Sequence, residues 1–215
     1  MTGCRKDRKL LSGLHQLGLE PTERQLRQIE QLFQLLQRWN RAYNLTRITT
    51  WDHFLTRHLF DSLAALPYLK GERTLDVGTG AGFPGLPLAI FSPQPTFTLL
   101  DAVAKKVDFV EMAVLELGLT NVEAVHARIE AFRPSEPFQT IVSRAVGSLL
   151  ELWKSCARLL AGGGRLVVYK GKHPSEELAE LPREVRYRVV PVEVPFLRAE
   201  RHLVIIETQN PEELD

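Results

Sequence analysis

Cysteine is scarce in this chain of 215 residues, which contains only Cys4 and Cys156. Two cysteines cannot build a disulfide framework or a cysteine-rich metal site, so we expect a protein of a reducing cytoplasm that binds no metal. No apolar run approaches the roughly 20 residues of a membrane span, and the basic residues near the N-terminus precede no stretch of signal-peptide length. These absences favour a cytoplasmic protein without membrane contact.

An excess of one charge is also missing, because 27 basic side chains stand against 26 acidic ones. A nucleic-acid-binding domain usually carries a marked basic excess. Any contact with RNA must therefore come from a local basic face. Hydrophobic residues make up 44% of the chain, enough for the core of one large domain, alone or with an appendage.

Residues 1–69 have helical patterns throughout. Thr22 and Gln25 are spaced as a capping box at the start of a helix. Apolar residues then recur at helical spacing, at Leu26, Ile29, Leu32, Phe33, Leu36 and Trp39. We expect Trp39, Tyr43 and Leu45 to anchor this helix against a main domain that begins at residue 70 and runs to residue 215.

A second helix is expected over about residues 52–66. It carries Arg57, His58 and Asp61 close enough together to share a face. No third metal ligand stands at a suitable spacing, so we expect His58 and Asp61 to pair with each other or with the backbone.

The most informative stretch runs from Thr74 to Gly85, with the sequence Thr-Leu-Asp-Val-Gly-Thr-Gly-Ala-Gly-Phe-Pro-Gly. A short apolar run predicts a buried strand, the glycines predict a tight turn, and Pro84 suits the first position of a helix. The last six residues match the dinucleotide fingerprint G-x-G-x-x-G, although glycine-rich turns also serve purely structural bends. Asp76 favours another ligand, because a carboxylate there would repel a pyrophosphate and attract the sulfonium and ammonium groups of S-adenosylmethionine.

Asp101 supplies the second half of this predicted site. It ends the β-prone run Thr96–Leu100, about twenty residues past the glycines, where an acid can hydrogen-bond both ribose hydroxyls. The alternative is an ordinary loop aspartate that caps the following helix, expected from Lys105 to a stop at Gly118.

Strand and helix patterns alternate from here, which predicts an α/β fold with a mostly parallel, doubly wound, Rossmann-like sheet. Further strands are expected at residues 121–125, 140–143 and 165–169, with a helix from Leu149 to Leu160 that Gly162–Gly164 closes. The last two β-rich runs, at 185–194 and 202–207, are expected to form a hairpin that ends the sheet. Such a closing hairpin is not typical of an NAD-binding domain.

Taken together, these motifs resemble the small-subunit ribosomal RNA guanine-N7 methyltransferase G family, also called glucose-inhibited division protein B. The resemblance rests on the glycine stretch and on six further motifs: Trp39-Asn40 with Tyr43-Asn-Leu-Thr46, Arg57-His58 with Asp61-Ser62, Leu100-Asp-Ala102 with Lys105-Lys106, Ser143-Arg-Ala145, Lys170-Gly171 and Glu200-Arg-His-Leu203. It covers nearly the whole chain. It implies a class I S-adenosylmethionine-dependent methyltransferase with a mostly parallel seven-stranded sheet, an N-terminal helical extension and one guanine of 16S rRNA as its target.

The resemblance also implies the residues of the site. The cofactor site would contain Gly78, Gly80, Gly82, Phe83, Asp101, Ala102, Ile129, Glu130 and Arg144. RNA contacts would come from Arg128, Arg144, Lys172 and Arg201, each of which could instead be a surface cation paired with a carboxylate. The partner would be 16S rRNA or the 30S subunit, and the protein would act as a monomer.

Guanine N7 carries an in-plane lone pair and no proton, so its methylation requires no catalytic base. We accordingly expect no acid–base dyad, and neither cysteine stands in a motif for attack on a pyrimidine. Two other functions stay open at this point. One is a non-catalytic RNA-binding or assembly protein with a Rossmann shell, and the other is an NAD-dependent oxidoreductase, which Asp76 and the closing hairpin disfavour.

Overall fold

The computed structural model describes residues 8–144 and 147–209. Cys4 and Ala145, on which two of the expectations above rest, lie outside these ranges. The described chain forms a seven-stranded sheet in the order β3-β2-β1-β4-β5-β7-β6. The strands are β1 (Arg73–Val77), β2 (Thr96–Asp101), β3 (Val122–His126), β4 (Phe138–Arg144), β5 (Leu160–Lys170), β6 (Arg186–Pro191) and β7 (His202–Glu207).

Strands β1 to β5 pair in parallel, and β7 inserts antiparallel between β5 and β6. The predicted Rossmann-like sheet with a closing hairpin is confirmed. Because β7 runs backwards, its first residue pairs with the last residue of β5, as His202 opposite Lys170. The start of β7 therefore lies at the same sheet edge as the carboxyl ends of the parallel strands.

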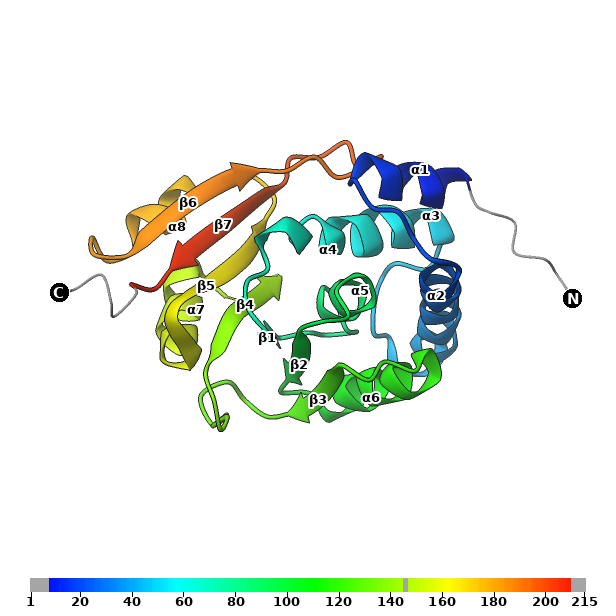
Figure 1. Cartoon of the computed structure of the whole chain (residues 1–215), viewed down its shortest axis with the longest axis horizontal. Helices are drawn as coiled ribbons and strands as arrows, with labels where there is room; N and C mark the ends of the chain where they lie inside the picture. The colour runs from blue at the N-terminus through cyan, green and yellow to red at the C-terminus, as the bar shows by residue number, and fades with distance from the viewer. Residues whose placement is uncertain (1–7, 145–146, 210–215) are drawn as a thin grey trace, which may run out of the picture.

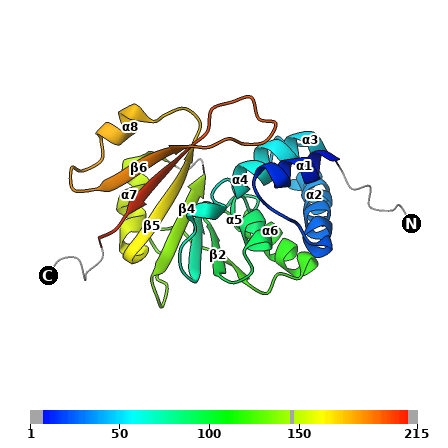
Figure 2. The same ribbon diagram turned by 45° about the horizontal axis from the view of Figure 1, so that its top comes forward.

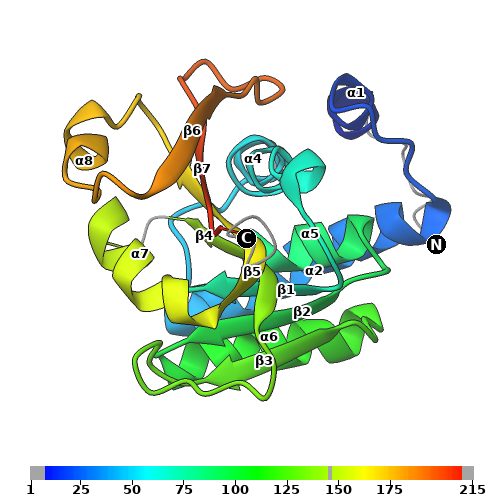
Figure 3. The same ribbon diagram turned by 60° about the vertical axis from the view of Figure 1, so that its left-hand side comes forward.

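Helices cover both faces of the sheet (Figure 3). They are α1 (Arg8–Gln16), α2 (Glu23–Tyr43), α3 (Trp51–Phe54), α4 (Asp61–Leu63), α5 (Gly85–Phe91), α6 (Ala104–Leu117), α7 (Leu149–Cys156) and α8 (Ser175–Ala179). Short 3-10 turns occupy Leu66–Tyr68 and Ala157–Leu159. No helix in the described ranges is long and apolar enough to cross a membrane.

Alternate residues of the central strands serve two separate cores. Leu99 and Val167 pack with α1 to α6, whereas Leu100 and Val168 pack with α7 and α8. This two-sided burial explains why the strands are nearly continuous hydrophobic runs. The N-terminal helices share the first core with the sheet, and in Figure 1 they lie above α5 and to its right.

The helix expectations are confirmed in α2 and α6. Thr22 and Gln25 form the capping box of α2, and Gly118 ends α6 in a left-handed conformation. Trp39 contacts Phe109 of α6 with ring centroids 5.8 Å apart. Tyr43 contacts Trp39 with its ring tilted by 32°, but it keeps 43% of its surface exposed and so anchors the helix less than expected.

Two local expectations are wrong. Gly162–Gly164 do not close a helix, because they belong to β5, where Thr208 and Gln209 after β7 hydrogen-bond the glycine backbone. Pro84 is the N-cap of α5 rather than its first helical residue.

Candidate functional site

The glycine turn closes over the end of β2. Gly78 and Thr79 donate their backbone N–H groups to the carbonyl of Leu100, at 2.9 and 3.0 Å. Gly80 donates its N–H to Asp101 Oδ2 at 2.9 Å, and its φ of +61° suits glycine. The turn and Asp101 therefore form one unit at the carboxyl edge of the sheet, where ligands of open α/β sheets bind.

A cavity of about 450 Å³ lies at this edge. Seven of the predicted site residues line it: Gly78, Asp101, Ala102, Arg128, Ile129, Glu130 and Arg144. Arg128 was predicted as an RNA contact, and it also lines the cavity of the predicted cofactor; its RNA contact stays a prediction. We refer to this space as the cofactor cavity.

Three predicted cofactor residues do not line this cavity. A Cβ on Gly82 would lie 2.2 Å from the Leu86 side chain, so Gly82 allows the turn to pack on α5. A Cβ on Gly80 would meet no atom within 4 Å, which leaves open space above the turn. Phe83 is 4% exposed and stacks on His58, with ring centroids 4.2 Å apart and planes 15° apart.

Asp76 is fully buried behind the turn rather than facing the cavity. Its Oδ2 accepts hydrogen bonds from Thr79 Oγ1 at 2.6 Å and from the Gly85 N–H at 2.8 Å. Burial raises the pKa of Asp76 to about 6. Asp76 therefore ties the glycine turn to the start of α5, and the direct contact with cationic groups inferred from the sequence does not match this geometry.

The Asp101 carboxylate is held in place by backbone donors on both oxygens. Oδ2 accepts from Gly80 as above, Oδ1 accepts from the Val103 N–H at 2.9 Å, and Lys106 Nζ lies 3.5 Å from Oδ2. A carboxylate offers about four lone-pair sites, so these bonds leave capacity for ribose hydroxyls. The ribose role of Asp101 stays a prediction.

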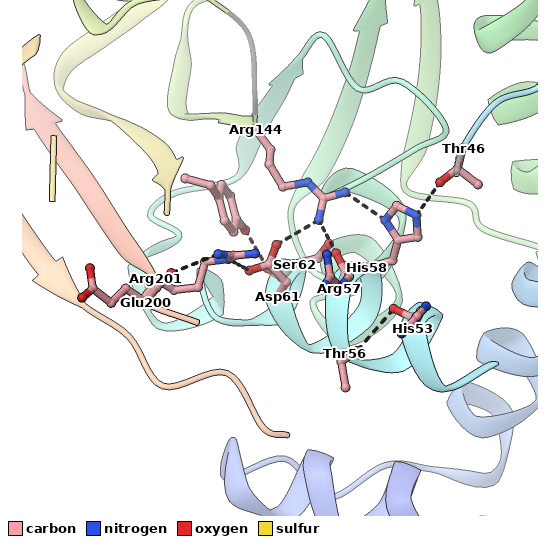
Figure 4. A network of polar contacts seen from close by, with 11 residues as sticks. Thr46, His53, Thr56, Arg57, His58, Asp61, Ser62, Arg144, Glu200 and Arg201 are labelled. Carbon is pink, nitrogen blue, oxygen red and sulfur yellow. Dashed lines mark hydrogen bonds and ion pairs between the residues drawn. The ribbon is translucent and has the colours of Figure 1, made fainter. Parts of the chain in front are cut away.

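A second cavity of about 440 Å³ lies next to the first. It is lined by Arg57, His58, Asp61, Arg144, Tyr169, Lys170, Gly171 and Arg201. Arg144, at the end of β4, borders both cavities. We refer to this second space as the target cavity, and Figure 4 shows the polar network around it.

Asp61 is the centre of this network. It is 5% exposed and accepts from Arg201 Nε on Oδ1 at 2.7 Å and from Arg144 Nη1 on Oδ2 at 3.2 Å. Arg201 immediately precedes β7 and Arg144 is the last residue of β4, and the two side chains converge on one carboxylate (Figure 4). The expectation that Asp61 and His58 pair with each other or with the backbone is therefore wrong.

His58 holds Arg144 from the other side. Its Nδ1 lies 3.2 Å from Arg144 Nη2, and its Nε2 lies 3.1 Å from Thr46 Oγ1. Because a guanidinium only donates, Nδ1 must accept, and the ring proton lies on Nε2. Burial, and secondarily the Arg144 charge, lower the pKa of His58 to about 3, which keeps the imidazole neutral.

The Tyr-Asn-Leu-Thr segment gains a structural explanation from these contacts. The Asn40 side chain accepts the backbone N–H of Thr46 at 2.8 Å, and Thr46 is the partner of His58. The helix bearing His58 passes through a π-helical stretch at Leu55–Phe60. Such stretches are frequent at functional sites, but no pattern in the sequence signals this one.

The remaining predicted cations differ in their surroundings. Lys172 is exposed and follows Gly171, which lines the target cavity. Arg128 is exposed at the cofactor cavity. Arg144 and Arg201 form the carboxylate pairs that were the alternative to RNA contact, yet both border the target cavity.

Comparison with known proteins gives a consistent result. The model of a family described as rRNA small subunit methyltransferase G matches residues 25–204. A protein named ribosomal RNA small subunit methyltransferase G from Laribacter hongkongensis is 48% identical over 91% of this chain and 95% of its own length. A protein of the same name from Methylococcus capsulatus is 46% identical over 89% and 93%.

Solved structures share the fold at low sequence identity. The O-methyltransferase TomG from Streptomyces achromogenes, solved with S-adenosylmethionine, has a TM-score of 0.59 and 14% identity over 95% of this chain and 99% of that one. A SAM-dependent methyltransferase from Aquifex aeolicus has a TM-score of 0.56 and 21% identity over 76% and 96%. The predicted class I methyltransferase fold is confirmed.

Proposed function

This chain belongs to the rRNA small subunit methyltransferase G family, and we propose that it methylates N7 of one guanine in 16S rRNA. It is an S-adenosylmethionine-dependent rRNA methyltransferase, so the proposal concerns the atom, the base and the residues. One observation supports it most: Arg144 borders both the cofactor cavity and the target cavity, so ligands in the two cavities would meet at one guanidinium.

The cofactor cavity suits S-adenosylmethionine. Gly78 provides bare backbone, Asp101 provides acceptor capacity for the ribose, and Ile129 provides an apolar side chain for the adenine. When bound, S-adenosylmethionine supplies a methyl group on a sulfonium leaving group. Ala102, Glu130 and the open space above Gly80 complete the proposed binding site, whereas Gly82 and Phe83 support it from behind.

The target cavity suits the Hoogsteen edge of guanine. Guanine presents the acceptors O6 and N7 at this edge, whereas adenine presents an N6 amino donor beside N7. Arginine side chains only donate, and Arg57, Arg144 and Arg201 all border the cavity. A donor-lined cavity therefore favours guanine over adenine.

Arg144 is the proposed positioning residue for this base. Its Nη1 donates to Asp61 and to the Arg57 carbonyl, and its Nη2 donates to His58. A guanidinium has five N–H donors, so two remain beyond these three bonds. Held from three sides, Arg144 can present them to O6 without losing its orientation, which aligns N7 with the methyl group.

No residue in this arrangement needs to remove a proton. His58 is neutral, and its Nδ1 lone pair is engaged by Arg144, while both Asp61 oxygens are engaged by arginines. Neutral N7 carries no proton, so the enzyme needs alignment and exclusion of water rather than base catalysis. Cys156 is buried, and burial raises the pKa of its thiol to about 12, which makes it a poor nucleophile.

The test is methyl incorporation from labelled S-adenosylmethionine into unmethylated 30S particles, followed by chain cleavage at 7-methylguanine. We expect one labelled guanine in 16S rRNA and a single-turnover rate that stays flat from neutral to mildly alkaline pH. Label at another atom, or a rate rising with unit slope, would contradict the N7 assignment. Binding without any incorporation would instead indicate the non-catalytic assembly protein.

Three further parts of the proposal concern organisation. We propose a helical extension at 1–69 before a methyltransferase domain at 70–215, a monomeric state and action in the cytoplasm. Support for the extension comes from helices α1 to α4, which all precede β1.

A further inference from the structure

A third cavity lies next to the target cavity. It is a groove of about 1050 Å³ between α1 and the loop 192–201 that joins β6 to β7. Arg201 borders both this groove and the target cavity, as Arg144 borders both the target and cofactor cavities. Figure 2 shows the loop arching from the sheet toward α1. The groove therefore adjoins the cavity proposed for the target guanine.

Phe196 is the most unusual residue in this loop. It keeps 47% of its surface exposed, and its φ is +62°, a conformation that bulky side chains rarely adopt. The ring lies beside the buried Phe60, with centroids 6.2 Å apart, and Lys9 Nζ lies 5.3 Å from the ring centroid. Residues held in such backbone conformations cluster at active sites and at segments that contact ligands.

The loop that carries Phe196 is anchored at both ends. Val192 N–H donates to the Arg201 carbonyl at 2.9 Å, and Leu197 N–H donates to the Val194 carbonyl at 3.1 Å. Val194 is buried in the core. The ring is therefore presented by a defined loop rather than by a loose one.

Two more rings line the groove. His173 and His202 face each other edge to face at 5.6 Å, and His202 Nδ1 lies 2.8 Å from the Gly171 carbonyl. A row of planar side chains beside cationic residues is how proteins bind single-stranded nucleic acid, because every base has a face that can stack.

The charges indicate which part of a nucleotide enters. Glu193 and Glu200 line the groove with Arg201, so its interior does not favour a phosphate. Two exposed cations are adjacent in sequence to residues that line the groove. Lys172 precedes His173, and Arg198 follows Leu197. This arrangement suits bases in the groove and phosphates along the edge.

We propose that this groove binds the unpaired nucleotides next to the target guanine, with one base stacked on Phe196. The inference rests on the proposed function, since the target cavity defines which nucleotides are neighbours. It commits to single-stranded RNA, because paired bases cannot present a face to the ring.

The test compares Phe196→Gly with the wild type for affinity to unmethylated 30S particles. Glycine suits a φ of +62°, so this variant loses the ring without losing the loop. We expect a 5- to 150-fold weaker affinity, the range for one base–aromatic stack, with unchanged affinity for S-adenosylmethionine. Phe196→Tyr should bind like the wild type.

Tyr187→Ala is the matched control. Tyr187 is 46% exposed on β6 and does not line the groove, so its loss should leave 30S affinity unchanged. A second readout uses 2-aminopurine beside the target in reconstituted particles, whose fluorescence should fall on binding wild type but not Phe196→Gly.

A Phe196→Gly affinity within about two-fold of wild type would overturn the inference, as would unquenched 2-aminopurine on both sides of the target. These outcomes are distinct from failure of the proposed function. If binding depends on Phe196 but no methyl reaches N7, the function fails and the groove stands. If N7 is methylated and Phe196→Gly binds normally, only the groove inference fails.

Discussion

Asp61 accepts a hydrogen bond from Arg201 at 2.7 Å across 140 residues of sequence, and this contact joins the start of β7 to the N-terminal helices. The second oxygen of Asp61 holds Arg144 at 3.2 Å. A single carboxylate thus positions two of the three arginines that line the target cavity.

Replacing Asp61 by asparagine should therefore destabilise the fold as well as the site. Asp61 is 7% exposed at its side chain, and its arginine partners are 17% and 24% exposed, so solvent screens these bonds only partly. We expect a loss of about 1.5–3 kcal/mol in the free energy of unfolding, measured by urea denaturation. Glu116→Gln, which breaks the exposed pair with Arg38, should cost less than about 1 kcal/mol. Equal losses in the two variants would contradict a central role for Asp61.

His58→Asn should change the pH dependence of stability, because asparagine retains an acceptor for Arg144 but does not titrate. His58 has a pKa lowered from 6.5 to about 3, so the folded state stays neutral where the unfolded state is protonated. The contribution of neutral His58 to the free energy of unfolding is fully present above pH 6.5, and it is lost as the pH falls from 6.5 toward 3. The stability of the wild type relative to the variant should rise by up to ~1.4 kcal/mol per pH unit in this window.

The comparison with the variant is needed because Asp76 acts in the opposite direction. Its pKa is raised from 3.8 to about 6, so the folded state retains a proton that the unfolded state loses, and stability falls as pH rises through that range. The two effects overlap in the wild type alone. Urea denaturation of both proteins at pH 4 to 7 separates them, and parallel curves would mean that His58 does not titrate as described.

Substitutions in the glycine turn should separate binding from folding. Gly80→Val enters open space, at a strain of about 1–2 kcal/mol from its φ of +61°. It should leave a folded protein that binds S-adenosylmethionine at least ten-fold more weakly by calorimetry. Gly82→Ala meets Leu86 at 2.2 Å and should cost a further ~1–3 kcal/mol of stability. A folded Gly80→Val variant with unchanged affinity would place the cofactor elsewhere.

Lys172→Ala should weaken binding to 30S particles and lower the salt slope of the affinity by about one. Lys172 is exposed beside the target cavity, and its loss removes one phosphate contact without disturbing Asp61, whereas Arg201→Ala would do both. Filter binding at several salt concentrations measures the slope. Lys154→Ala, on the exposed face of α7, is the control and should leave the slope unchanged.

The sequence alone predicts the elements whose signals are local. The glycine turn, the strand end at Asp101, the capping box at Thr22 and the stop at Gly118 depend on residues a few positions apart, and each is present in the structure. Arg144 was predicted as a site residue from the resemblance to a known family, and in the structure it borders both cavities.

Long-range contacts account for what the sequence did not predict. Asp61 lies 83 residues from Arg144 and 140 from Arg201, and only the sheet topology, with β7 reversed beside β5, brings them together. Gly162–Gly164 suggested a helix stop because glycine usually ends helices, but pairing with the chain after β7 makes them part of a strand. The sequence did not indicate a special role for Phe196, because its positive φ is imposed by the loop and not by the residue type.

The central claim is that methyl transfer uses the lone pair of guanine N7 and no enzymic base. The most direct test replaces the target guanine by 7-deazaguanine, which has a carbon at that position, in a reconstituted 30S particle. In a single-turnover assay with saturating S-adenosylmethionine, we expect full incorporation into the guanine particle. The 7-deazaguanine particle should bind with similar affinity and gain no label. Methylation of the 7-deazaguanine particle at the target nucleotide would contradict the account.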